Sequence, residues 1–280
     1  MEKTIGFIGQ GFIGKNYADD FEARGFKVVR YAAEPQYAAY KEKIKECDIV
    51  FIAVPTRTTP EGFDGRIVRE VVKLVGEGKT AVIKSTVTPG TTESIQKENP
   101  GIFVFHSPEF LNEATAREDA AHPVRTIVGI PVISGEYRKK AEVIVGVLPK
   151  APYTKICSAR EAEIIKYARN TLGYVRVVFA NILYDFAEKS GADWAVIREA
   201  ISADPDNGPT YANALHKSGR GAGGRCFIKD FAAFAAMYEA AVGDPLGMEV
   251  IKSLEAKNIE LLKTSNKDID LLHGVYGDEI

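Results

Sequence analysis

The stretch from Ser158 to Ser190 constrains the fold more than any other part of this sequence. It contains no proline and is followed by Gly191. Ser158 and Glu161 form a capping box, in which each side chain satisfies a free N–H group of the first helical turn. Apolar residues recur at steps of three and four, the period of an α-helix, at Ile164, Ala168, Leu172, Val175, Phe179, Ile182 and Phe186. The pattern predicts a helix roughly 45–50 Å long, which joins two domains and offers an apolar stripe to a core or to another subunit.

Lys166 and Asn170 lie one turn apart on the same face of this predicted helix, within an otherwise apolar run. From these residues alone, two interpretations stay open. The pair is either a snorkelling lysine beside a core amide, or two polar groups placed for chemistry.

Composition limits the classes of function. The chain has 280 residues, 45% of them hydrophobic, which is enough for an ordinary core and two domains. A formal net charge of −2 gives no reason to expect nucleic acid or an anionic membrane as a partner. No apolar segment approaches the length of a membrane span, so we expect a soluble cytoplasmic protein. Cys47, Cys157 and Cys226 form no CxxC pair, which argues against a disulfide framework and a metal site.

The N-terminus carries a dinucleotide-binding fingerprint. Residues 3–9 form an apolar strand, Gly9, Gly11 and Gly14 follow with GxGxxG spacing, and a helix then runs to about Arg24. The glycines allow the backbone to approach a pyrophosphate that faces the helix N-terminus. After the second strand, Phe26–Tyr31, Ala32 stands where a carboxylate would bind the ribose. Glu34 is the next acid and Arg30 favours a 2′-phosphate, so NAD and NADP both stay open.

Strands and helices continue to alternate, which predicts a parallel sheet. The expected elements are a helix over Gln36–Glu46, a strand over Cys47–Thr56, a helix over Gly65–Gly76, and strands over Thr80–Ser85, Ile102–Phe105 and Arg125–Ile130, the last of the sheet. Hydroxyl side chains from Ser85 to Thr92 lie at the carboxyl edge, where such sheets bind ligands. Glu109 and Glu113 are four residues apart, so they either share one helical face or form a solvated acidic surface. His106 and His122 have no partner motif and are interpreted as structural.

The second half is predicted to be helical, with one candidate nucleophile. A helix is expected over Asp193–Ala203, followed by a polar loop over Asp204–Thr210. The glycine-rich run from Ser218 to Asp230 then leads into a helix over Phe231–Ala241, and its glycines allow close approach to a ligand. Cys226 lies on this run between Arg225 and Lys229, whose positive potential favours a thiolate. We therefore interpret Cys226 as a nucleophile rather than as a buried structural cysteine.

With these pieces in order, the chain resembles the UDP-glucose/GDP-mannose dehydrogenase family from the first strand to about residue 262. The segments that carry the resemblance are GQGFIG, AVPT, STVTPGTT, SPEFLNEATA, AEIIKYARN and GAGGRCFIKD. The family oxidises the C6 alcohol of a nucleotide sugar to a carboxylate in two NAD-dependent steps. The resemblance implies that Cys226 forms a thiohemiacetal and then a thioester. It implies oxyanion contacts from Lys166 and Asn170, proton transfer by Glu109 and Asp230, and a water held by Thr86.

The resemblance also implies the binding residues. Cofactor contacts are expected from Gly9, Gly11, Phe12, Ile13, Gly14, Glu34, Val54, Pro55, Thr56, Thr86 and Glu113. Substrate contacts are expected from Glu109, Phe110, Leu111, Lys166, Asn170, Lys217, Gly221 and Gly223. The expected fold class is α/β, with a Rossmann-type parallel sheet followed by an all-helical domain and one long connecting helix. The expected parts are a Rossmann-like NAD-binding domain over residues 1–152, a helical central and dimerisation domain over 153–265, and a polar, frayed tail over 266–280.

The chain departs from the family in several places. The family ordinarily has a third, C-terminal α/β domain that grips the nucleotide, and this sequence stops before it. The segment between the second strand and Cys47 is short, so the sheet is expected to lack a strand. The loop ahead of the glycine-rich run has Asp206-Asn207-Gly208 and no arginine.

Two alternative functions stay open. A β-hydroxyacid-type dehydrogenase shares the two-domain plan and the Lys-x-x-x-Asn helix, but transfers one hydride without a cysteine. A non-catalytic binding subunit, or half of an enzyme completed by a separate nucleotide-binding partner, would explain the missing domain. The expected assembly is a homodimer that binds a UDP- or GDP-sugar.

Overall fold

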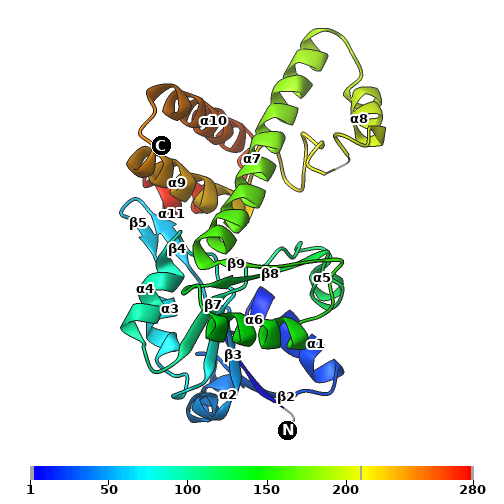
Figure 1. The fold of residues 1–280 in the computed structure, drawn as a ribbon. Helices are drawn as coiled ribbons and strands as arrows, with labels where there is room; N and C mark the ends of the chain where they lie inside the picture. Colours follow the sequence, from blue (N-terminus) through cyan, green and yellow to red (C-terminus); the bar gives the residue numbers. More distant parts are fainter. Residues whose placement is uncertain (1–2, 209, 279–280) are drawn as a thin grey trace. The chain divides into compact units, whose positions relative to one another are not determined.

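The computed structural model describes residues 3–208 and 210–278 of the chain (Figure 1). Met1 and Glu2, Pro209 of the predicted polar loop, and Glu279 and Ile280 of the predicted tail lie outside the described residues. The chain divides into two compact units. The first consists of Met1–Thr56 and Asp64–Lys166, and the second of Arg57–Phe63 and Tyr167–Ile280.

A seven-stranded sheet forms the centre of the first unit. Its order is β2 (Lys27–Tyr31), β1 (Thr4–Ile8), β3 (Ile49–Ile52), β6 (Thr80–Ile83), β7 (Phe103–His106), β8 (Arg125–Ile130) and β9 (Tyr153–Ser158). All neighbouring strands are parallel except β7 and β8, which are antiparallel. Strand β2 is an edge strand, and the described chain between β2 and β3 contains no strand. The prediction that the sheet lacks one strand of the Rossmann order is therefore confirmed.

Helices cover both faces of this sheet. Phe7, Phe51, Val82 and Phe105 are aligned across four strands and face one side. On that side they pack in one buried cluster with residues of α1 (Phe12–Ala23), α5 (Ala116–Ala121) and α6 (Gly135–Val147). The opposite side contacts α3 (Arg66–Val72) and α4 (Thr91–Glu98), which Figure 1 shows apart from α1 and α6. The inner strands of the sheet are therefore buried on both faces, as their near-continuous apolar sequences predict.

Two sequence predictions about this unit are wrong. Arg125–Ile130 is not the last strand, because β9 follows it and pairs in parallel with β8 along six residues. Strand β9 is half exposed and rich in polar residues, so its sequence lacks the apolar run of a buried strand. The helix expected over Gln36–Glu46 is two short pieces, α2 (Pro35–Ala38) and the 3₁₀ helix η1 (Lys41–Glu46).

The predicted long helix is confirmed as α7 (Ala159–Lys189). Its capping box is present, since Glu161 accepts hydrogen bonds from the N–H and hydroxyl groups of Ser158, at 2.7 and 2.8 Å, and Ser158 Oγ accepts one from the Glu161 N–H. The boundary between the two units falls within this helix, after Lys166. Strand β9 and the first turns of α7 therefore belong to the first unit, whereas the sequence predicted a domain boundary after residue 152. Whether the second part is a dimerisation domain stays a prediction.

The second unit is mainly helical. It contains the rest of α7, α8 (Trp194–Ala203), α9 (Gly224–Ala241), α10 (Pro245–Thr264) and α11 (Ile269–Tyr276). A hairpin of β4 (Arg57–Thr59) and β5 (Gly62–Asp64), which the sequence did not suggest, brings β4 against α9 and α11. The core joins α7, α9 and α10, where the Tyr174 and Phe231 rings stack with centroids 3.8 Å apart.

The tail predicted to be frayed is instead folded. Leu272 and Val275 of α11 are buried against Ile228 of α9 and Leu262 of α10. The sequence was misleading because these few apolar residues stand among polar ones. No helix in the described ranges is both long and apolar enough to cross a membrane.

Candidate active site

The glycine-rich loop after β1 has the backbone that the fingerprint predicts. Gly9 has a φ of +91°, and a Cβ atom there would lie 2.2 Å from the Ala53 carbonyl oxygen. A Cβ atom at Gly14 would lie 1.9 Å from the Gly9 carbonyl oxygen, so packing requires both glycines. At Gly11, by contrast, no atom lies within 4 Å of an added Cβ. Gly11 is the N-cap of α1, and within the described ranges no side chain caps this helix, so the residues fit a dinucleotide pyrophosphate.

The expected cofactor residues come from neighbouring strand ends. Val54, Pro55 and Thr56 follow β3, and Thr86 follows β6, the next strand of the sheet. The Ser85 hydroxyl ties these ends together, because it accepts a hydrogen bond from the Val54 N–H at 2.9 Å and donates one to the Val54 carbonyl at 2.8 Å. Phe12 is exposed at the start of α1, and Ile13 packs against the sheet.

At the end of β2, Ala32 is buried and Glu34 is exposed. Arg30 is not free to meet a 2′-phosphate, because two carboxylates of α1 hold it. Its guanidinium pairs with Glu22 and with Asp19, each at 2.7 Å. The positive charge of Arg30, which favours NADP in the sequence, is thus already paired with carboxylates of the protein.

Glu109 lies in a buried group of ionisable residues. Its side chain is 3% exposed and accepts a short hydrogen bond from the Leu111 N–H. Lys166 donates a hydrogen bond from Nζ to the Glu109 carbonyl oxygen at 2.6 Å. The neighbouring Phe110 ring lies 5.7 Å from Lys166 Nζ and 4.1 Å from the Arg125 guanidinium carbon. The structure therefore brings Glu109, Phe110 and Lys166 together, as the resemblance implies.

Glu109 and Glu113 do not share a helical face. Residues 107–112 form no helix, and α5 begins only at Ala116. Glu113 is exposed whereas Glu109 is buried. The spacing of four residues was misleading here because Pro108 and the segment after it run in an irregular conformation. Both earlier interpretations, a shared helical face and a solvated acidic surface, are wrong for Glu109.

Lys84 is part of the same group, and sequence reasoning missed it. Its side chain is 3% exposed, and Nζ donates to the Ser107 carbonyl at 3.3 Å and lies 4.2 Å above the Tyr17 ring. The signal was available, since a lysine ends an otherwise apolar strand directly before Ser85.

Burial dominates the electrostatics of this group. It raises the pKa of Glu109, although Lys166 and Lys84 act in the opposite direction. It lowers the pKa of Lys84 to about 8 and the pKa of the fully buried His106 to about 3. His106 is therefore neutral at pH 7. A buried carboxyl group with a raised pKa is the kind of group that general acid–base chemistry uses.

In the second unit, Asn170 and Asp230 form a direct pair. Asn170 Nδ2 donates to Asp230 Oδ2 at 2.6 Å, and Lys229 Nζ donates to Asp230 Oδ1 at 2.6 Å. Asp230 is buried, whereas Cys226, four residues earlier on α9, is exposed. Helix α9 begins at Gly224, so the expected start at Phe231 is wrong and Cys226 lies within the first turn.

The glycines before Cys226 pack against the protein itself. A Cβ atom at Gly221 would lie 3.1 Å from Asn258 Oδ1, and one at Gly223 would lie 2.1 Å from Asp268 Oδ2. These contacts explain why the two positions are glycine; the expected substrate contacts of Gly221 and Gly223 stay predictions. Lys217 is exposed, with a φ of +54°.

Comparison with known proteins identifies the family. Residues 36–143 match the NAD binding domain of the UDP-glucose/GDP-mannose dehydrogenase family, and residues 160–259 match its central domain. YtcA of Bacillus subtilis strain 168 is 33% identical over 207 residues, which are 69% of this chain and 46% of YtcA. The UDP-glucose 6-dehydrogenase AglM of Haloferax volcanii is 30% identical over 295 residues, covering 88% of this chain and 67% of AglM.

A solved structure agrees with this assignment. The UDP-glucose dehydrogenase of the archaeon Pyrobaculum islandicum aligns with a TM-score of 0.78 at 27% identity, over 93% of this chain and 68% of its own. The chain thus spans about half to two thirds of the length of these relatives. Both domain matches and the AglM alignment lead to one conclusion: the chain belongs to the UDP-glucose/GDP-mannose dehydrogenase family.

Proposed function

We propose that the chain carries the NAD-binding and catalytic residues of a nucleotide-sugar 6-dehydrogenase, which oxidises the C6 alcohol of a UDP- or GDP-sugar to a carboxylate. The observation that carries the proposal is the arrangement on α9. Cys226 is exposed in the first turn, and one turn later Asp230 is buried and bound to Asn170. An exposed thiol one helical turn from a fixed polar pair suits the formation of a covalent intermediate.

The chain's own residues account for the remaining steps. Lys166 and Asn170 stabilise negative charge on the C6 oxygen. The Cys226 sulfur bonds to the aldehyde carbon to give a thiohemiacetal, whose oxidation gives a thioester. Water then attacks the thioester carbon, Glu109 accepts the proton of that water, and the thiolate leaves. NAD, when bound at the loop from Gly9 to Gly14, supplies the hydride acceptor for both oxidations. Capture of Arg30 by Asp19 and Glu22 supports NAD over NADP.

The test uses the purified chain with NAD and a panel of UDP- and GDP-sugars, with reduced cofactor and sugar acid measured separately. We expect Cys226→Ser to abolish acid formation and to leave slow reduction of NAD, since the first hydride step does not need the thiol. Cys157→Ser, at the half-buried cysteine of β9, is the matched control and should behave as wild type. Lys166→Ala should impair both steps by about 3–4 kcal/mol.

Other outcomes identify the alternatives. Wild-type acid formation by Cys226→Ser would refute the thioester mechanism. A single hydride transfer that is insensitive to Cys226→Ser but lost in Lys166→Ala would indicate a β-hydroxyacid-type enzyme. Nucleotide-sugar binding without any turnover would indicate a binding subunit or a requirement for a partner protein.

The proposal includes a homodimer that forms through α7. The predicted apolar stripe lies on the exposed side of this helix, where Leu172 is 65% and Phe186 is 72% exposed, and Ile164, Phe179 and Ile182 are also exposed. The opposite side, with Tyr174 and Val178, packs into the second unit's own core. Exposed apolar side chains in a row of this length favour association with a second copy.

A further inference from the structure

The turn between α10 and α11 is fixed to the glycine-rich loop that precedes Cys226. Its residues are Ser265–Asp268, and the last three of them belong to the tail that the sequence predicted to be frayed. Lys267 is nevertheless 5% exposed, and its Nζ donates to the carbonyl oxygens of Gly221 and Gly219, at 2.9 and 3.4 Å. An ammonium group is buried at a cost, and burial lowers the pKa of Lys267. Two loop carbonyls offset that cost.

Asp268 caps a helix to which it does not belong. It is the N-cap residue of α11, but its side chain makes no capping bond there. Its Oδ2 accepts the Gly224 N–H at 2.7 Å instead, the first N–H of α9. The N-cap of α9 is Gly223, which has no side chain to perform this task. Helix α9, which carries Cys226, thus obtains its cap from a residue 44 positions later in the chain.

The backbone of the turn is held in an unfavourable conformation. Asn266 and Asp268 both have positive φ angles, +52° and +54°. Non-glycine residues adopt this conformation rarely and at a cost. In this turn, the conformation accompanies the contacts of Lys267 and Asp268 with the loop.

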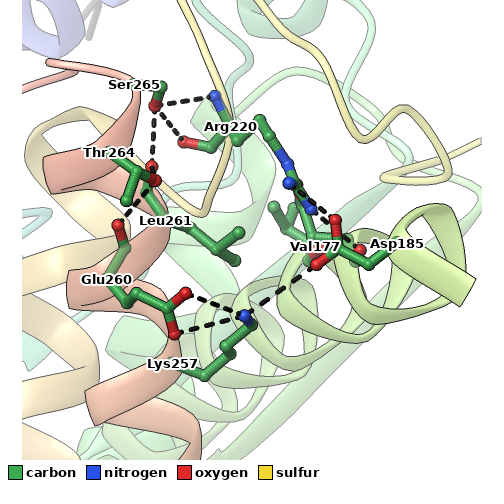
Figure 2. A network of polar contacts seen from close by, with 9 residues as sticks. Val177, Asp185, Arg220, Lys257, Glu260, Leu261, Thr264 and Ser265 are labelled. Carbon is green, nitrogen blue, oxygen red and sulfur yellow. Dashed lines mark hydrogen bonds and ion pairs between the residues drawn. The ribbon is translucent and has the colours of Figure 1, made fainter. Parts of the chain in front are cut away.

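Arg220 holds the same loop from the side of α7. Its N–H donates to Ser265 Oγ at 3.0 Å and its guanidinium pairs with Asp185 at 2.7 Å (Figure 2). The guanidinium also donates to Asn181 Oδ1 at 2.9 Å. Figure 2 also shows Lys257 of α10 reaching Asp185 and Glu260. The loop is therefore held between α7 and the α10–α11 turn.

From these contacts we propose that Lys267 and Asp268 are positioning residues for Cys226. Without the remote cap, the first turn of α9 has free N–H groups and frays. The Cys226 thiol lies in that turn. The importance of Cys226 itself rests on the proposed function; the control of its position does not.

The test compares Asp268→Ala with Asp270→Ala. Asp270 is an exposed acid two residues further along α11, so it provides the matched control. Hydrogen exchange over residues 218–228 and the rate of Cys226 alkylation by iodoacetamide, resolved from Cys47 and Cys157 by mass spectrometry, are the readouts. Loss of an N-cap predicts an increase in local opening of about two- to thirtyfold, with exchange in the sheet unchanged.

Asp268→Asn provides the rescue, because asparagine caps helices about as well as aspartate. We expect exchange and alkylation close to those of wild type for Asp268→Asn and for Asp270→Ala. If Asp268→Ala does not fold, Lys267→Met tests the same attachment of the turn to the loop, because it removes the hydrogen bonds to the Gly219 and Gly221 carbonyls. Unchanged exchange over residues 218–228 and unchanged alkylation in a folded variant would overturn the proposal.

The steady-state test separates this proposal from the proposed function. In an active protein, Asp268→Ala should lower kcat for acid formation and leave the KM for NAD unchanged. An inactive wild-type protein whose Cys226 alkylation still depends on Asp268 would refute the proposed function alone. An active protein in which Asp268→Ala has wild-type kcat and wild-type alkylation would refute the positioning role alone.

Discussion

Lys84→Met tests whether the buried charge beside Glu109 destabilises the fold. Burial lowers the pKa of Lys84 from 10.5 to about 8, and this shift corresponds to about 3 kcal/mol of lost stability at neutral pH. The hydrogen bonds that methionine would lose, to the Ser107 carbonyl and hydroxyl, are long, at 3.3 and 3.5 Å. These hydrogen bonds and the contact of Lys84 with the Tyr17 ring stabilise the folded state by about 1 kcal/mol, which offsets part of the cost of burial. We therefore expect Lys84→Met to be more stable than wild type by about 2 kcal/mol at pH 7.

The pH dependence of the free energy of unfolding shows whether Lys84 stabilises or destabilises the fold. Between pH 8 and pH 10.5 the unfolded chain binds the Lys84 proton and the folded chain does not, so wild-type stability rises with pH across this window. In Lys84→Met this rise is absent, and the advantage of the variant shrinks as the pH increases.

The assay is urea unfolding followed by far-ultraviolet circular dichroism, because the single tryptophan, Trp194, lies in the second unit and does not report on the sheet. Lys97→Met, at an exposed lysine of α4, is the control. Parallel stability curves for wild type and Lys84→Met from about pH 7 to about pH 10 would refute the reasoning.

Three further predictions concern the cofactor, the fold and the assembly. Ala32→Asp should restore a ribose-binding carboxylate and tighten NAD about tenfold to a hundredfold in calorimetric titration, whereas no change would show that Ala32 is not at the ribose. Glu163→Gln should lower the free energy of unfolding, measured in urea, by about 2–4 kcal/mol. The buried Glu163 carboxylate accepts three hydrogen bonds, from the N–H groups of Gly90 and Thr92 and from the Thr92 hydroxyl. A loss of stability no larger than that of the exposed Glu161→Gln would contradict this. Phe179→Glu should convert the dimer to a monomer in light scattering, and a wild-type protein that is already monomeric at micromolar concentration would contradict the assembly.

Local patterns predicted much of this structure. The capping box of Ser158 and the loop from Gly9 to Gly14 involve residues close in sequence, whose geometry their own spacing determines. The failures have a different origin. The contacts of Lys84 with Ser107 and of Asp268 with Gly224 join residues 23 and 44 positions apart. No local period records such contacts: the apolar strand before Lys84 indicated that its side chain is buried, but not which groups it contacts, and the polar sequence around Asp268 gave no sign of its contact.

The N-termini of several helices also depend on groups outside the helix, and the N-terminus of α1 concerns cofactor binding. Four helices, α1, α3, α4 and α9, have a glycine as N-cap and therefore cannot cap themselves. Carboxylates outside these helices cap three of them. Asp64 accepts the Arg66 N–H of α3 at 3.0 Å, Glu163 accepts the Thr92 N–H of α4, and Asp268 accepts the Gly224 N–H of α9. Among the described residues, no side chain caps α1 at Gly11, and its first turn contains no acid. This free helix start is where the fingerprint places an anionic pyrophosphate.

Gly11→Asp tests that assignment. Gly11 has an extended backbone with a φ of −75°, and an added Cβ meets no atom within 4 Å, so aspartate fits and can cap α1 itself. Stability should change by only a few tenths of a kcal/mol, since glycine and aspartate differ little as N-caps. The carboxylate would occupy the free N–H groups and repel the pyrophosphate, and NAD affinity should fall by about 2–4 kcal/mol. Gly11→Asn, similar in size but neutral, should lose much less. Equal NAD affinity in wild type and Gly11→Asp, measured by calorimetry, would mean that the pyrophosphate does not bind at the start of α1.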